Sequence, residues 1–417
     1  MIKLVKKLIM ICKDELKSEF SLSKSALKDI IDNTFMGFSE TELDHLIASK
    51  LIDSTIIDGE LMFYNRAIDS VLESIPQIRC KLKKNNVKRN YLIDENLEYH
   101  IQYWSRKSAH NAKMVSNIDV TYTAEPINYQ EYSAYSFYLP APIVSNRQRC
   151  LLSLFSCKPT YVAPHYHRKR TAYWSEETHQ KKVFSRYSLL SFSEMVNLVD
   201  CQTIIDNSNV FEEKPLICFS KRVIKLYREL SNNCLKPYSY IKQVYDYITT
   251  NYKYSFVRNY KTIDSIVDLC IERQAGDCGS LAMLMVSLLR LFGIKSRVVG
   301  GMQIQINLDG SYKNYTHDWV EIYTIEKEWI PIDPFMGVVA HMFKDEASRL
   351  FYLGNIDPLR IITCNNGMIS FEPKEPSVCD DPFDNQVGEI FCNNICLDYH
   401  SVNRGLIINN IDFAFEN

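Results

Sequence analysis

Apolar residues recur at three- and four-residue spacings from Leu281 to Phe292, the spacing that places side chains along one side of an α-helix. The pattern predicts a buried helix over this run. Gly293 follows it and is expected to end the helix as a C′ glycine. Asp277, a residue type that caps helix N-termini, stands before it. Cys278 is therefore expected in the first turn of the helix.

Three strands are predicted after this helix, because the chain there is rich in β-branched and aromatic residues and is interrupted by turn sequences. The Asp309-Gly310 pair marks a tight hairpin turn between the first two strands. Antiparallel pairing of the second strand with the third would place His317 and Asp333 side by side, facing the helix that carries Cys278. The predicted strands cover residues 295–306, 315–323 and 329–333.

Cys278, His317 and Asp333 are suited to a Cys-His-Asp centre for acyl transfer or hydrolysis. A helix N-terminus favours the reactive thiolate, a histidine can take the thiol proton, and a carboxylate can hold the imidazole tautomer. Each residue also has an ordinary alternative role: a packed core thiol, a structural hydrogen bonder and a turn former. Their occurrence within 56 residues, counted from 278 to 333, on a helix start and two paired strands favours the catalytic interpretation.

Four segments around these residues resemble the transglutaminase-like superfamily in its bacterial form. They are residues 275–278, 289–301, 317–323 and 329–334. The resemblance implies a papain-like α+β core in which the helix carrying the nucleophile packs on an antiparallel sheet. It further implies that Cys278 attacks an amide or ester carbonyl, that His317 acts as general base and then acid, and that Asp333 orients the imidazole.

The same resemblance implies an oxyanion held by the backbone N–H of the nucleophile and by a donor from an upstream aromatic residue. Tyr254 is the candidate for that donor. Asp277, Gly279 and Trp319 would lie next to the cleft. The resemblance extends over roughly residues 215–375.

Two units are predicted before this core. Residues 1–90 combine helices with a strand–Asp58-Gly59–strand hairpin and are similar to a winged-helix module, although acidic residues on the second helix argue against DNA binding. Residues 95–200 contain short alternating runs that predict an antiparallel β-sandwich. Residues 210–417 would form the catalytic domain with a C-terminal extension. The runs are residues 97–103, 118–123, 133–139, 149–155 and 184–192.

Composition limits the remaining possibilities. The 417 residues carry a net charge of −2, so no general attraction to nucleic acid or to an anionic membrane is expected. The 13 cysteines show no disulfide-like framework, and the apolar run Leu8–Cys12 is too short for an export signal. A cytoplasmic protein with reduced thiols is expected. The spacings of His165-x-His167 and Cys392-x₃-Cys396 do not match a zinc site, so neither a metal nor a cofactor is expected.

The sequence leaves more than one function open. The leading hypothesis is a cysteine peptidase or amide hydrolase, or a Gln acyltransferase, that acts on a protein or peptide. Hydrolysis is preferred because no amine-binding site is apparent. A non-catalytic interaction scaffold that retains the fold is the alternative. A peptide N-glycanase is disfavoured, because the paired Cys-x-x-Cys zinc site of those enzymes is absent before Cys278. Oligomeric state is not indicated.

Overall fold

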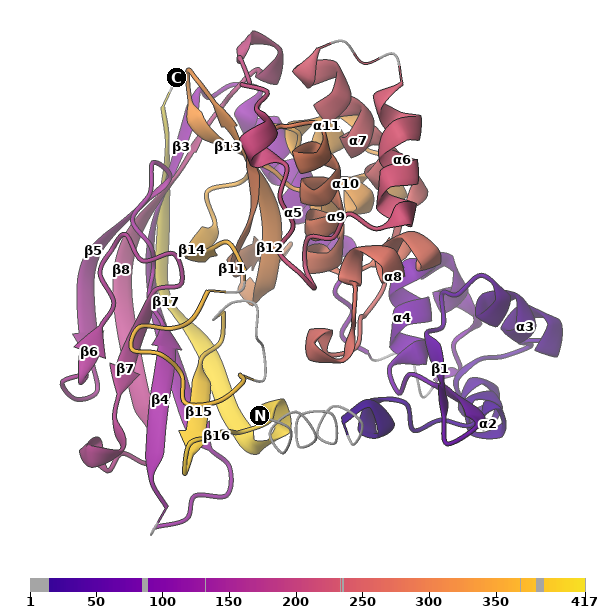
Figure 1. The fold of residues 1–417 in the computed structure, drawn as a ribbon, viewed down its shortest axis with the longest axis horizontal. Coiled ribbons are helices and arrows are strands. Elements are labelled where there is room, and N and C mark those ends of the chain that lie inside the picture. The colour runs from indigo at the N-terminus through magenta and orange to yellow at the C-terminus, as the bar shows by residue number, and fades with distance from the viewer. Residues whose placement is uncertain are drawn as a thin grey trace.

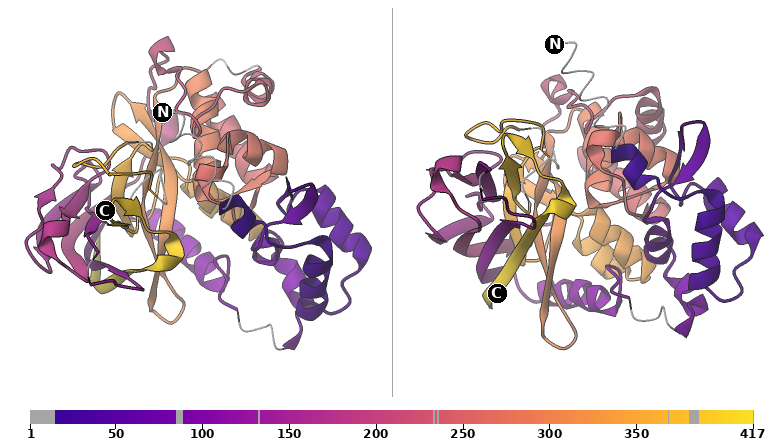
Figure 2. Two further views of the ribbon diagram at one scale, coloured as in Figure 1. Left: turned by 60° about the horizontal axis from the view of Figure 1, so that its bottom comes forward. Right: turned by 90° about the horizontal axis from the view of Figure 1, so that it is seen from below.

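The computed structural model describes residues 15–84, 89–131, 133–232, 234, 236–367, 369–379 and 386–416. A β-sandwich lies on one side of a central sheet, and a group of helices lies on the other (Figure 1). The N-terminal unit packs against the helical side, away from the sandwich, in each view of Figure 2. The fold is therefore α+β with antiparallel main sheets, as the sequence predicts.

The central sheet has the strand order β13-β12-β11-β14, and each neighbouring pair is antiparallel. This confirms the three strands predicted after the nucleophile helix and adds β14 at the edge. Pairing of Gly301 with His317 sets the register of β11 and β12. The strands are β11 (Ser296–Ile306), β12 (Tyr312–Thr324), β13 (Glu328–Ile332) and β14 (Arg360–Asn365).

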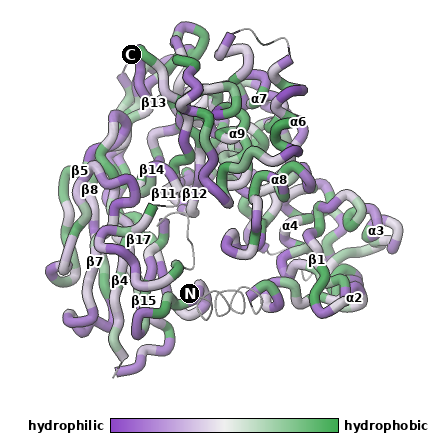
Figure 3. The backbone as a smooth tube through the Cα atoms, in the orientation of Figure 1, coloured by the Kyte–Doolittle hydropathy of each residue, from purple (hydrophilic) through white to green (hydrophobic). Residues whose placement is uncertain are grey.

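Helix α9 (Cys278–Leu291) is the centre of the helical side and is buried from Gly279 to Arg290. Its green, hydrophobic path lies among the other helices in Figure 3. Gly293 ends it with a φ of 86°, which a glycine adopts without strain. The surrounding helices are α6 (Lys221–Ser231), α7 (Pro237–Asn251), α8 (Ile266–Arg273), α10 (Pro334–Met342) and α11 (Glu346–Phe351).

The sandwich consists of two antiparallel sheets with strand orders β17-β3-β8-β5 and β16-β15-β4-β7-β6. Trp174 of one sheet meets Phe155 of the other, with ring centroids 5.9 Å apart. Four of the five runs predicted as strands lie largely in this sandwich. The strands are β3 (Lys113–Pro126), β4 (Tyr135–Pro140), β5 (Gln148–Phe155), β6 (Tyr161–Val162), β7 (Thr171–Trp174), β8 (Val183–Glu194), β15 (Glu389–Cys392), β16 (Ile395–Cys396) and β17 (Val402–Glu416).

The C-terminal segment belongs structurally to this sandwich. Residues 389–416 fall within the range 210–417 that the sequence groups as the catalytic domain. In the structure β15 pairs with β4, and β17 pairs with β3 along almost its whole length. Alternating apolar residues of β17 complete an edge of β3 that would otherwise remain unpaired.

The strand prediction for residues 97–103 is wrong, because this segment lies within helix α5 (Glu95–Ser108). Leu97, Ile101 and Trp104 are buried on one side of the helix, at the spacing of successive helical turns. Asp94 caps the helix by accepting hydrogen bonds from the backbone N–H groups of residues 96 and 97. Helix α5 packs against β11 of the central sheet, where its His100 accepts a hydrogen bond from the backbone N–H of Ile306.

The N-terminal unit contains the helices and the hairpin expected from the sequence. Ser39 and Glu42 form a capping box at the start of α3. Arg273 of α8 connects it to the core by donating to the backbone carbonyls of Lys50 and Leu51 at 3.0 and 3.1 Å. The apolar run Leu8–Cys12 lies outside the described residues. The elements are α2 (Lys24–Thr34), α3 (Glu40–Ala48), β1 (Ser54–Ile57), β2 (Glu60–Phe63) and α4 (Ala67–Ser74).

Within the described ranges, none of the helices combines the length and the apolar character needed to span a bilayer.

Candidate active site

Cys278 is the first residue of α9, as expected, and is half-buried. Asp277 caps the helix by accepting hydrogen bonds from the backbone N–H and the hydroxyl of Ser280, at 2.9 and 2.6 Å. Tyr260 donates a further hydrogen bond to the same carboxylate oxygen. The chain enters the helix through the short strand β10 (Ala275–Gly276), which pairs in parallel with β9 (Lys253–Tyr254). The turn that presents the thiol is thus held from several directions.

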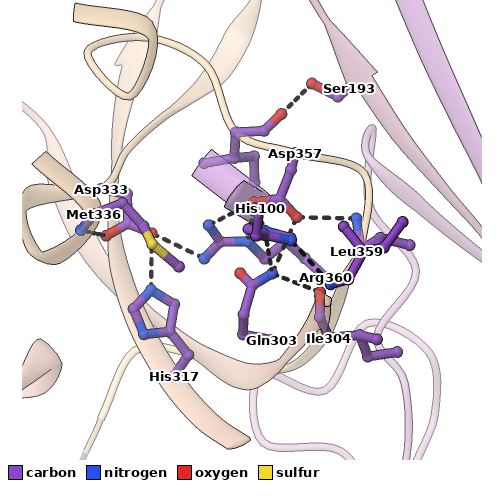
Figure 4. Close-up of polar contacts among 12 residues, drawn as sticks. His100, Ser193, Gln303, Ile304, His317, Asp333, Met336, Asp357, Leu359 and Arg360 are labelled. Atoms are coloured by element: carbon purple, nitrogen blue, oxygen red, sulfur yellow. Dashed lines mark hydrogen bonds and ion pairs between the residues drawn. The ribbon is translucent and has the colours of Figure 1, made fainter. Parts of the chain in front are cut away.

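His317 and Asp333 are in direct contact (Figure 4). His317 Nε2 lies 2.8 Å from Asp333 Oδ2, and both side chains are almost completely buried. Asp333 also caps α10, because its Oδ1 accepts the backbone N–H of Met336 at 3.0 Å. With Nε2–H donated to a carboxylate, the lone pair of the imidazole is on Nδ1. Nδ1 is buried and has no hydrogen-bond partner among the described residues.

Cys278 lies against the strand residue that follows His317. Burial has the largest effect on the pKa of the Cys278 thiol and raises it, and the charge of Asp333 also raises it. A hydrogen bond from the backbone N–H of Asp318 to the sulfur lowers the same pKa. No direct hydrogen bond joins the sulfur to His317 in the described part of the chain. The structure therefore brings His317 and Asp333 together and places Cys278 next to them.

The electrostatics of the thiol differ from the sequence expectation. Burial raises the pKa of Cys278 well above its usual range, and the carboxylates of Asp318 and Asp277 raise it further. These effects oppose the helix N-terminus, which was expected to favour the thiolate. Burial lowers the pKa of His317, and the charge of Arg360 adds to this, whereas Asp333 opposes it. The resting site consequently combines a neutral thiol with a neutral imidazole.

Asp333 remains ionised in this environment. Burial alone would raise the pKa of its carboxyl group, but His317 and Arg360 and the N–H of Met336 together lower it. Arg360 Nη1 donates to Asp333 Oδ2 at 2.9 Å, on the same oxygen that His317 contacts. The guanidinium therefore supplies a positive charge directly behind the Asp333 carboxylate.

A buried network behind Asp333 was not identified from the sequence (Figure 4). Arg360 donates to Asp357 from Nε and Nη2 at 3.0 and 2.8 Å, so it joins the two carboxylates. Asp357 also accepts from Gln303 at 3.1 Å and lies 3.6 Å from the ring of His100 in α5. The sequence carries one indication of this network. Asp357 and Arg360 are charged residues three positions apart inside an apolar segment that ends in Ile361 and Ile362.

The remaining predicted site residues lie around the same centre. Tyr254 is buried, and burial raises the pKa of its hydroxyl well above the usual range. The charge of Cys278 has the next largest effect on this pKa and also raises it. Trp319 is fully buried, and its ring lies 6.1 Å from that of His317. A Cβ atom on Gly279 would lie 2.6 Å from Tyr260 Oη, so no larger residue fits there without a shift. Tyr254 as oxyanion donor stays a prediction.

One edge beside the thiol carries a residue from the C-terminal part of the chain. Gln386 donates to Asp318 Oδ1 at 2.7 Å and to the backbone carbonyl of His317 at 3.2 Å, so a C-terminal residue covers this edge. A cavity lined by Met283, Gly300 and Asp318 has a volume of about 10 Å³, which accommodates roughly one water molecule. The residues that line this cavity do not include Cys278.

Among the residues that the structure describes, no group of three or more His, Cys, Asp or Glu side chains is arranged to hold a metal ion.

Residues 224–334 match the family model of the transglutaminase-like superfamily, and this part of the chain is a transglutaminase-like core. A candidate cysteine protease from Cytophaga hutchinsonii is 16% identical over 73% of this chain and 93% of its own, with a TM-score of 0.43. The periplasmic domain of TgpA from Pseudomonas aeruginosa is 16% identical over 60% of this chain and 95% of its own, with a TM-score of 0.31. No curated protein matches the chain.

Proposed function

We propose that the protein is a thiol enzyme that acts on amide bonds of a protein or peptide, with Cys278 as nucleophile. The supporting observation is the buried His317–Asp333 pair, in which Nδ1 has no partner among the described residues and is available as the base for the thiol beside it. The proposal needs no metal and no cofactor.

In the proposed reaction the neutral pair reacts in one step. Nδ1 of His317 takes the thiol proton as the Cys278 sulfur attacks the carbonyl carbon, and the imidazolium is stabilised by Asp333. The proton then passes to the leaving amine as the C–N bond breaks, which leaves an acyl-enzyme. Water deprotonated by His317 attacks the thioester, releases the acid and regenerates the thiol. Hydrolysis is preferred over transfer to an amine, because no described feature points to an amine site.

The test is mass spectrometry of the purified full chain after incubation with a mixture of peptides that contain Gln and internal amide bonds. We expect an acyl adduct on Cys278 and release of an amine. Cys278→Ala should show neither, while Cys201→Ala, which changes a half-buried thiol outside the site, should behave as the wild type. Turnover that survives in Cys278→Ala would exclude this cysteine as the nucleophile.

A non-catalytic scaffold is the second candidate function, and the raised pKa of Cys278 favours it. A thiol whose pKa is raised by burial and by neighbouring carboxylates is poorly disposed to react at rest. In that case neither the peptide mixture nor a small electrophilic carbonyl probe should leave an adduct on the wild type. An adduct with the small probe alone would show that the chemistry is intact and that access limits it.

A further inference from the structure

A cavity of about 550 Å³ lies where the end of the sandwich meets the turn between β12 and β13. Its sandwich wall includes Lys113 of β3, Arg149 of β5 and Phe192 of β8, and its other wall includes Lys327 of the turn. This volume falls within the range of roughly 300–1,000 Å³ that small-molecule sites occupy. None of the residues that line the cavity belongs to the candidate triad.

Arg147 lines the same cavity and is the unusual group in it. Its side chain is only 7% exposed, and its Nε and Nη1 atoms are buried without a hydrogen-bond partner in the part of the chain that the structure describes. Burial lowers the pKa of Arg147, but a guanidinium stays charged at neutral pH. A buried charge without a partner is costly, so the folded chain gains from any anion that pairs with it.

The two carboxylates whose charges act on Arg147 both have other cationic partners. Glu321 accepts from Arg297 at 2.9 and 2.6 Å, through both Nε and Nη2. Glu194 pairs with Lys327 at 2.6 Å. Each of these carboxylates therefore already compensates another cation, and Arg147 has neither of them to itself.

The cavity is lined by further cations and an aromatic ring, and also by the carboxylates of Glu194, Glu326 and Glu328. Arg149 and Lys113 lie 5.9 and 5.5 Å from the centre of the Phe192 ring, one from each neighbouring strand. Lys113 pairs with Glu416 at 3.2 Å, whereas Arg149 is exposed. The side chain of Asn146 also borders the cavity, and its amide donates to the backbone carbonyls of Lys327 and Trp329 at 3.5 Å. Guanidinium and ammonium groups beside an aromatic ring are suited to an oxyanion attached to a small apolar body.

We propose that this cavity binds a small oxyanion, a carboxylate or phosphate group, with the Arg147 guanidinium as its anchor and Arg149 and Lys113 as secondary contacts. The shared chemistry is a pair of negatively charged oxygens that a planar guanidinium can hold. The site is independent of the proposed amide chemistry, since its occupancy is measured without any turnover.

The test measures thermal unfolding and calorimetric binding of the full chain with inorganic phosphate and, separately, with succinate. Sodium chloride at equal ionic strength corrects for general screening. We expect one of the two anions to raise the unfolding temperature above the chloride control and to give saturable binding. Phosphate and succinate thereby distinguish the two sources of the oxyanion.

Arg147→Met should weaken that binding about tenfold or more, the effect of losing one hydrogen bond to a charged group. Lys225→Met, which removes one charge from an exposed position on α6, should bind as the wild type does. Arg149→Met should weaken binding less than Arg147→Met. If Arg147→Met fails to fold, anion binding by Arg149→Met tests the site in its place. Absence of saturable binding by both anions, or unchanged binding in both arginine variants, would overturn the proposal.

Discussion

Asp333 shows most directly how single residues set the properties of the candidate site. It contacts His317 and Arg360 through Oδ2 and caps α10 through Oδ1. One carboxylate thus orients the imidazole, pairs with a buried cation and starts a helix. Because the residue is completely buried, each of these contacts is made without competition from water.

Arg360→Met should strongly destabilise the protein, because it leaves the carboxylates of Asp333 and Asp357 buried without their common cation. We expect a loss of about 3–5 kcal/mol in the free energy of unfolding, the range for breaking a buried ion pair from one side. Urea denaturation measures it. Arg106→Met, at the exposed end of α5, is the control and should stay within about 0.5 kcal/mol of the wild type. A loss below 1 kcal/mol would mean that the network contributes little.

The pH dependence of the site follows from the lowered pKa of His317. A neutral imidazole is required as base, so kcat/KM should keep its plateau below pH 6.5, the ordinary value of histidine, and fall only in more acidic solution. For stability, the unfolded chain binds the His317 proton first as the pH falls. The contribution of His317 is therefore fully present above about pH 6.5 and is lost as the pH falls from there toward the folded-state pKa.

This expectation can be checked by a pH–rate profile and by an NMR titration of the His317 ring. His317→Gln should flatten the part of the stability profile that lies below pH 6.5. A measured pKa of 7 or above for His317 would show that the negative charge of Asp333 outweighs burial.

At the level of elements, the close pairing of β11 with β14 decides which residue can stand at position 301. A Cβ atom on Gly301 would lie 1.8 Å from the backbone carbonyl oxygen of Ile361. This contact is with backbone, so the two strands would have to separate. The glycine is therefore required by a neighbouring strand rather than by its own conformation.

Gly301→Ala should cost roughly 3 kcal/mol or more of unfolding free energy, at the upper end for overpacking, because β14 also carries Arg360. Gly405→Ala is the matched control in β17, where the added Cβ would meet the Thr123 hydroxyl at 3.3 Å. The control should lose about 1 kcal/mol or less. Equal losses in denaturant titrations of the two variants would contradict the close-approach argument.

At the level of the whole molecule, the C-terminal strand connects the sandwich to the catalytic side. Phe413 of β17 packs on Trp104 of α5, with ring centroids 5.6 Å apart, and α5 supplies His100 to the buried network. Buried apolar residues of the sandwich, of α5 and of the catalytic core form one contiguous cluster. The two parts are therefore expected to unfold together.

Phe413→Ala should lower the unfolding free energy by roughly 2 kcal/mol, which is less than the loss expected for a fully buried phenylalanine. The variant should still unfold in a single cooperative transition. Ile407→Ala, exposed on the same strand, should change it by less than about 1 kcal/mol. Far-UV circular dichroism and tryptophan fluorescence would follow the two parts. Separate transitions in the wild type would show that the sandwich and the core are independent folding units.

The local elements of the core were predictable because short-range patterns determine them. The apolar spacing of α9, the cap at Asp277 and the hairpin around Gly310 each depend on residues a few positions apart. The prediction for residues 97–103 failed because short apolar runs fit both strand and helix. The cap at Asp94 and the packing of Trp104 decide for the helix.

The sequence by itself predicted the run from helix α9 to strand β13 and the residues Cys278, His317 and Asp333, of which the structure brings His317 and Asp333 into contact. Tertiary structure decided the pairing of β17 with β3, the cation behind Asp333 and the protonation of the thiol. These features depend on groups far apart in the chain and on how completely water is excluded around them. A helix start favours a thiolate wherever it occurs, but only the folded environment of Cys278 determines whether burial and neighbouring carboxylates outweigh that effect.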